Sequence, residues 1–97
     1  RSDEALHETQ EAIRLGPDIG EAYFDLGVLH FRSGDLNSAA TAFREAFRLE
    51  PDSAPAGNNL AGTCLKLGRV DEARATLLTM RERGLDIDPP LARALAP

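Results

Sequence analysis

The sequence lacks the cysteine pairs that form disulfides and the long apolar runs that form membrane spans. It contains a single cysteine, Cys64, so no disulfide can form within the chain. No apolar run approaches the roughly 18 residues that a membrane-spanning helix requires. These absences favour a soluble, cytoplasmic protein in a reducing compartment, without a membrane partner.

Positive charge is also scarce. Eleven basic residues stand against 16 acidic ones, and the formal net charge is -5. This balance argues against a general nucleic-acid surface, and we expect no nucleic-acid partner. A chain of 97 residues forms at most one small domain with a modest core.

The motifs that carry most enzyme chemistry are missing as well. The chain has no phosphate loop, zinc-ligand spacing, nucleophile elbow or glycine-rich dinucleotide turn. Carboxylates such as Glu8, Glu11, Asp35 and Asp52 flank expected helix ends and solvated faces, where acidic residues are ordinary. We therefore expect no enzymatic activity, no cofactor and no metal.

What the chain does contain is helical periodicity, clearest in residues 20–51. Apolar and aromatic residues recur there at spacings of three and four on both sides of a central turn, so each set lies along one side of a helix. Gly27 and Ala39 are small where two such helices would cross. Gly34 suits the left-handed residue that ends a helix, and Pro51 cannot continue the second one. The pattern predicts a helical hairpin.

This hairpin resembles a tetratricopeptide repeat. The signature of that family has a bulky residue, Leu, Gly and Tyr on the first helix, then Ala and Phe on the second, then Pro. The matching residues here are Tyr23, Leu26, Gly27, His30, Ala39, Phe43 and Pro51, with His30 in the Tyr place. The resemblance implies an all-α, antiparallel helix-hairpin solenoid, a right-handed superhelix of about two and a half repeats.

An offset of 34 residues extends the pattern along the chain, since Ala5 pairs with Ala39 and Pro17 with Pro51. We expect a single domain over 1–97, made of the second helix of a partial repeat (3–18), a full repeat (19–52), a full but degenerate repeat (53–84) and a terminal cap (85–97). The expected helices are 3–15, 19–33, 36–49, 53–67 and 70–83, with a short helix at 90–96.

The two ends of the predicted solenoid differ. At 3–15 a second helix stands without its first, whereas Arg81 and Arg83 replace the apolar Phe47 and Leu49 at the other end. We therefore expect the array to end at its C-terminal side and to be open at its N-terminal side. A homodimer through the N-terminal helix follows as one expectation.

Two residues invite a chemical interpretation. His30 and Cys64 occupy equivalent places in successive repeats, so they could lie near one another as a nucleophile or metal pair. The alternative, which we favour, is that both replace a packing residue on the buried side of a hairpin. His7 is expected on the solvent side of its helix.

The concave face of the solenoid is the expected binding site. In tetratricopeptide arrays the first helices line this face, which implies a groove formed by Glu21, Phe24, Asp25, Val28, Phe31, Arg32, Asn58, Asn59, Gly62, Leu65 and Lys66. Phe24, Val28 and Phe31 form one apolar stripe, and such a stripe usually marks an interface. The alternative is that the cap or a neighbouring repeat covers it.

Some members of the family hold a terminal carboxylate with Lys and Asn on one first helix, Asn on the next, and Lys and Arg on a third. Only Asn59 matches that clamp, because Phe24 and Val28 stand in the places of its first Lys and Asn. Binding of chaperone tails is therefore not expected. Asp25 followed by Asn59 weakly resembles the asparagine ladder by which some arrays bind a peptide backbone.

Two function classes remain after these exclusions. The chain is either a module that binds a protein or peptide, or a structural and self-association segment of a larger protein. For the first class we expect a ligand with an apolar anchor on the stripe and a basic group attracted by Glu21 and Asp25. Asn58 and Asn59 would bind the ligand backbone.

Overall fold

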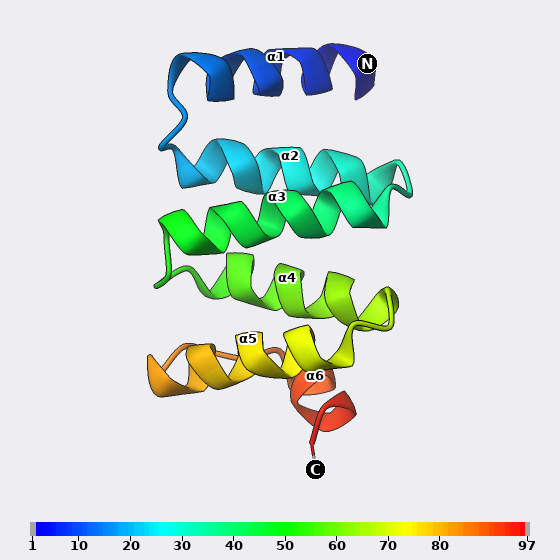
Figure 1. Ribbon diagram of the computed structural model, residues 1–97, viewed down its shortest axis with the longest axis vertical. Coiled ribbons are helices and arrows are strands. Elements are labelled where there is room, and N and C mark those ends of the chain that lie inside the picture. The colour runs from blue at the N-terminus through cyan, green and yellow to red at the C-terminus, as the bar shows by residue number, and fades with distance from the viewer. Residues whose placement is uncertain (1, 97) are drawn as a thin grey trace.

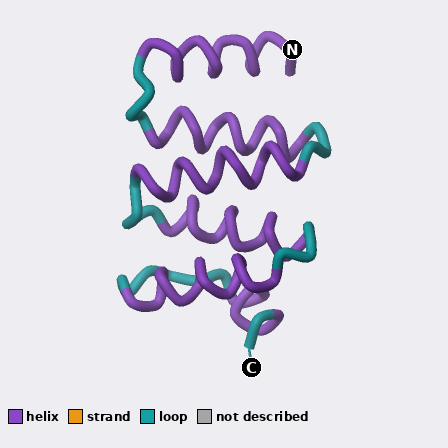
Figure 2. The backbone as a smooth tube through the Cα atoms, viewed as in Figure 1, coloured by secondary structure: helices purple, strands orange, loops and turns teal. Residues whose placement is uncertain are grey.

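The computed structural model describes residues 2–96, which form six α-helices: α1 (Ser2–Leu15), α2 (Gly20–Arg32), α3 (Leu36–Leu49), α4 (Ala54–Lys66), α5 (Val70–Glu82) and α6 (Pro89–Ala94). The helices follow one another in chain order with alternating direction, so that α1 lies at one end and α6 at the other (Figure 1). Short loops join them (Figure 2), and the elongated body measures 41 × 25 × 18 Å. The fold is the expected all-α arrangement of antiparallel helix pairs.

The helix boundaries follow from local chemistry. Gly34, Gly68 and Gly84 end α2, α4 and α5 in the left-handed conformation, with φ of 87°, 78° and 71°. Asp35 begins α3 by accepting a hydrogen bond from the Ser38 amide at 3.1 Å, and Ser53 caps α4 in the same way. The first five helices agree with the expected bounds to within one residue, and the expected 90–96 helix is α6.

The hydrophobic core runs from α3 to the C-terminal end. Its buried members include Phe43 and Phe47 of α3, Leu60 of α4, Met80 of α5 and Leu95 after α6. In each hairpin, a glycine of the first helix lies against a large side chain of the second helix. A Cβ atom at Gly27 would lie 2.5 Å from the Phe43 ring, and one at Gly57 would lie 2.6 Å from the Met80 sulfur.

Helix α1 is packed more loosely than the others. It lies along α2, but none of the residues 3–15 is buried, and the Leu15 side chain is 75% exposed. His7 is exposed, as expected. The helix therefore covers α2 without contributing to the core.

Candidate functional site

A groove of about 350 Å³ opens where α2, α4 and the C-terminal segment meet. Val28, Phe31 and Arg32 of α2 form one wall, and Asn59, Gly62 and Lys66 lie along α4. The remaining lining residues are Phe43, Asn58, Thr63, Asp88 and Leu91. Half-buried apolar side chains thus meet polar and charged ones over one strip of surface.

Seven of the eleven residues expected in the binding groove line this one, namely Val28, Phe31, Arg32, Asn58, Asn59, Gly62 and Lys66. Phe24 instead packs on Phe43, with ring centroids 5.7 Å apart and an interplanar angle of 58°. Leu65 packs against the core, whereas Glu21 and Asp25 are exposed outside the groove. The expected apolar stripe is therefore divided between core and groove.

Asn58 already has hydrogen-bond partners within the chain. Its side chain is 8% exposed and binds the protein's own loop after α5. Its Nδ2 donates to the Asp86 carbonyl at 3.0 Å, and its Oδ1 accepts from the Asp88 amide at 2.9 Å. The amide does bind an extended backbone, but that backbone belongs to residues 86–88 of the same chain.

The C-terminal segment also forms part of the groove, in line with the alternative that the terminal cap covers part of this face. Asp88 and Leu91 line it, and both belong to residues 85–97, which were expected to cap the last repeat. Two signals were present in the sequence. Leu91 is an apolar residue within the expected cap, and the polar Asn58 stands where the first repeat has Phe24.

Gly62 lies under the middle of the groove. A Cβ atom at this position would meet only Leu91 Cδ2, at 3.8 Å, which is an ordinary contact distance. This glycine differs from Gly27 and Gly57, whose hypothetical Cβ atoms would overlap Phe43 and Met80. Within the described structure, close packing explains those two glycines but not Gly62.

The charges at the groove are mainly basic. Arg32 and Lys66 occupy the last turns of α2 and α4, where a cation also favours the negative end of the helix dipole. Neither forms an ion pair with any residue of the part of the chain described here. Asp88 is the one acidic residue in the lining. Glu21 and Asp25, which were expected to attract a basic group, lie outside this lining.

His30 and Cys64 have separate surroundings. His30 Nδ1 lies 4.0 Å from the Asp35 carboxylate, and its side chain is 20% exposed. Cys64 is fully buried, and burial together with the neighbouring Glu72 raises the pKa of its thiol to about 11. A thiol with that pKa stays protonated and unreactive at neutral pH. The packing interpretation of Cys64 therefore holds.

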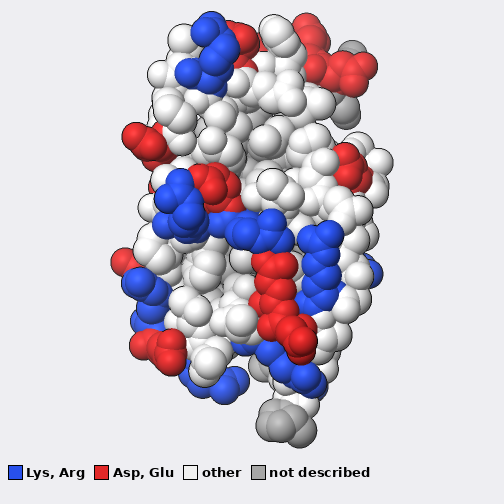
Figure 3. All heavy atoms as spheres, viewed as in Figure 1, with Lys and Arg blue, Asp and Glu red and all other residues white. Residues whose placement is uncertain are grey.

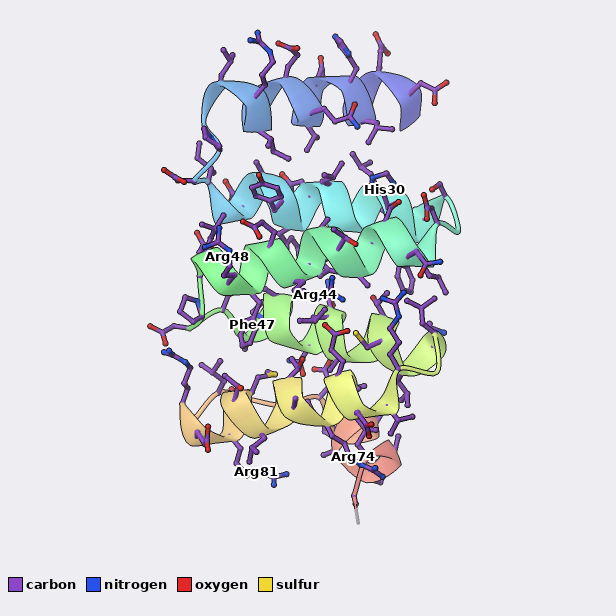
Figure 4. The ribbon with its side chains drawn as sticks, in the orientation of Figure 1. His30, Arg44, Phe47, Arg48, Arg74 and Arg81 are labelled. Atoms are coloured by element: carbon purple, nitrogen blue, oxygen red, sulfur yellow. The ribbon has the colours of Figure 1, made fainter. Side chains whose placement is uncertain are left out.

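Charged side chains link successive helices. Figure 3 shows basic and acidic groups close together across the middle of one face. Arg44 extends from α3 toward α5 (Figure 4) and binds the Glu72 carboxylate through two hydrogen bonds of 2.6 and 2.9 Å. Arg83 similarly binds Asp52 at 3.0 Å. These pairs join neighbouring hairpins.

Residues 2–96 contain neither a cluster of metal-binding side chains nor a membrane-spanning helix. Histidine, cysteine, aspartate and glutamate side chains nowhere gather in groups of three or more that could hold a metal ion. No helix in this range combines the length and apolar character needed to cross a bilayer.

Comparison with known proteins identifies the repeat. Two family models, both described as tetratricopeptide repeat, match residues 30–96 and 1–54. The chain belongs to the tetratricopeptide repeat family. Repeats of this family generally serve as protein-interaction modules and are typically non-catalytic.

One curated relative is a tetratricopeptide protein, the Hsp70-Hsp90 organizing protein of Triticum aestivum. It is 34% identical over 53 residues, which is 55% of this chain. The match covers only 9% of that protein's length. The similarity therefore concerns a repeat segment and not the whole relative.

Proposed function

We propose that this chain is a non-catalytic interaction module that binds a segment of another protein in the groove along α2 and α4. The open space beside Gly62 supports this function most directly. A glycine inside a helix lowers stability by about 0.5–1 kcal/mol relative to alanine. Because no close packing requires a glycine at this position, we infer that it serves to keep the groove open.

The chemistry of the lining suggests the ligand. Val28 and Phe31 offer an apolar surface, and Arg32 and Lys66 line the same groove without acidic partners in the described chain. A volume of about 350 Å³ is near the lower end of the range for ligand sites. The groove therefore suits an apolar side chain next to an acidic residue. So small a surface supports only weak binding, roughly micromolar.

The printed name of the wheat relative mentions Hsp70 and Hsp90. We do not extend the proposal to these chaperones. Phe24 and Val28 occupy the places where the carboxylate clamp of the family has Lys and Asn, and Phe24 is packed on Phe43. A ligand of this groove would meet a different set of side chains.

The test is selection of binders from a random peptide library on the wild-type chain. Selected peptides should bind Gly62→Phe and Lys66→Glu at least about tenfold more weakly, because the first fills the groove and the second reverses its charge. Arg48→Glu is the matched control, since Arg48 lies on α3 and is not among the residues that line the groove.

Circular dichroism should show that all three variants keep the helical content of the wild type. If the selected peptides bind Gly62→Phe as tightly as the wild type, the groove is not the binding site. If the library yields no binder at all, the module does not recognise short segments.

A second candidate function is self-association through α1. Leu15 and Ile19 are 75% and 50% exposed. A hollow of about 520 Å³ also lies along α2 and α3, lined by Tyr23, Leu26, His30, Asn37, Ser38, Thr41, Ala42 and Glu45. In sedimentation equilibrium, dimers that disappear in Leu15→Glu would support this function. A monomer at every concentration would exclude it.

A further inference from the structure

Residues 85–96 occupy the α4 side of the groove in the manner of a bound peptide. Asn58 holds the carbonyl of Asp86 and the amide of Asp88, which are two residues apart in an extended stretch. A side-chain amide that bonds residues i and i+2 in this way reads the backbone and not the side chains. Any extended segment can make the same two bonds.

The side chains of the segment complete the resemblance to a ligand. Asp88 and Leu91 line the same groove as Lys66, and Leu91 lies over Gly62. Leu95, only 7% exposed, anchors the end of the segment in the core. The segment therefore combines an acidic residue with an apolar one three positions later. This is the chemistry that the groove favours.

The segment is held lightly. Helix α6 has six residues, none of them buried, and no side-chain cap. Its connection to the rest of the protein consists of the two Asn58 hydrogen bonds, the buried Leu95, and the partly buried Leu85, Ile87 and Leu91. Parts of a protein with so few buried contacts open without global unfolding.

We propose that residues 85–96 are an internal competitor for the groove and a template for its ligand. A partner segment displaces them, takes over the hydrogen bonds of Asn58 and places its own apolar side chain over Gly62. The preferred partner is an extended stretch with aspartate or glutamate three positions before a leucine-sized residue, as Asp88 precedes Leu91. This inference depends on the proposed function and adds the partner's pattern and the competition.

The first experiment measures binding in trans. The probe is an acetylated synthetic peptide with the sequence of residues 85–96, and the receptor is the full chain with Leu95→Ala, which weakens the internal segment. The peptide should bind this variant and bind the wild type at least about tenfold more weakly, because residues 85–96 of the wild type already cover the α4 side of the groove. Adding Asn58→Ala should lower the affinity about tenfold by removing two hydrogen bonds.

The matched control peptide carries Leu91→Asp and should not bind. If circular dichroism shows that Leu95→Ala is unfolded, Leu91→Ala replaces it, because Leu91 is only half-buried and its loss also vacates the groove. A folded variant that fails to bind the peptide would overturn the proposal. Equal binding to the wild type would overturn it too.

The second experiment measures amide hydrogen exchange in the full wild-type chain. The amides of Asp88, Leu91, Ala92 and Leu95 all donate hydrogen bonds and should exchange through local opening, faster than the amides of α3 and α4. Asn58→Ala should speed their exchange about tenfold and leave α3 unchanged. Exchange of these amides only with global unfolding would show that the segment is never displaced.

The results that would exclude the internal competitor differ from those that would exclude the groove as a binding site. Library peptides that lose affinity for Gly62→Phe, together with no binding of the 85–96 peptide, would leave the groove as a binding site and remove the competitor. If the competitor exists, the library peptides should bind Leu95→Ala at least about tenfold more tightly than the wild type.

Discussion

The two complete hairpins, α2–α3 and α4–α5, place the large and the small residue of one equivalent pair of positions on opposite helices. The first has Tyr23 on its first helix and the small Ala46 on its second. The second has Gly57 and Met80 at the equivalent positions, and Met80 fills the space above Gly57. Each exchange taken alone departs from the repeat pattern. Together they partly compensate, because Met80 fills space that the missing bulky residue at position 57 leaves, and close-packed interiors leave few voids.

The hairpins also differ in how well they are covered. Helix α2 has only Gly20, Ala22 and Gly27 buried, whereas α4 has seven buried residues. Helix α4 contacts α3, α5 and α6, while the outer neighbour of α2 is the loosely packed α1. In solenoids each unit is stabilised by its neighbours, so burial depends on what stacks on either side.

The largest effect on stability is expected from adding a methyl group at one of the two glycines, Gly27, and not at the other, Gly57. Gly27→Ala should destabilise the fold by about 1–3 kcal/mol, because the new methyl would overlap the buried Phe43 ring. Gly57→Ala should change stability by less than about 1 kcal/mol. Its methyl meets a flexible methionine side chain, and alanine favours the helix. Urea unfolding followed by circular dichroism measures both.

The control restores the arrangement of the first hairpin in the second. Gly57→Tyr alone should be strongly destabilising, and Met80→Ala in the same chain should recover most of the loss. A double-mutant cycle gives the coupling between the two positions. Additive effects would show that the two hairpins do not use compensating volumes.

A smaller effect is expected from the Arg44–Glu72 ion pair, which joins α3 to α5. The hydrogen bonds from Arg44 lower the pKa of Glu72 below its usual value of 4.5. The stabilisation is therefore complete above about pH 4.5 and disappears as the pH falls through the lower pKa of the folded state. Because both side chains are partly exposed, we expect about 0.2–1 kcal/mol.

The measurement is the free energy of unfolding of the wild type and of Glu72→Gln, at pH 7 and at pH 3.5. The variant should be less stable at pH 7, and the difference should shrink at pH 3.5. Gln10 and Ser38 stand 34 residues before Arg44 and Glu72, and being uncharged they cannot form such a pair between α1 and α3. A difference that is independent of pH would mean that Glu72 contributes through packing and not through its charge.

Most of the fold could be predicted from the sequence, because its determinants are local. The periodicity of apolar residues and the glycines at 34, 68 and 84 located the helices and their ends. The groove was predictable only in outline. Phe24 could equally face the ligand or the core, since one helix face borders both, and its contact with Phe43 depends on the neighbouring helix.

By itself the sequence determined the helices, the turns and the repeat offset, since each depends on residues a few positions apart or on the comparison of one segment with another. Only the tertiary structure decided that Met80 fills the space above Gly57 and that Asn58 binds residues 86–88. Both contacts join segments more than 20 residues apart. A buried amide binds whichever backbone groups the fold brings to it, and local sequence carries no record of which they are.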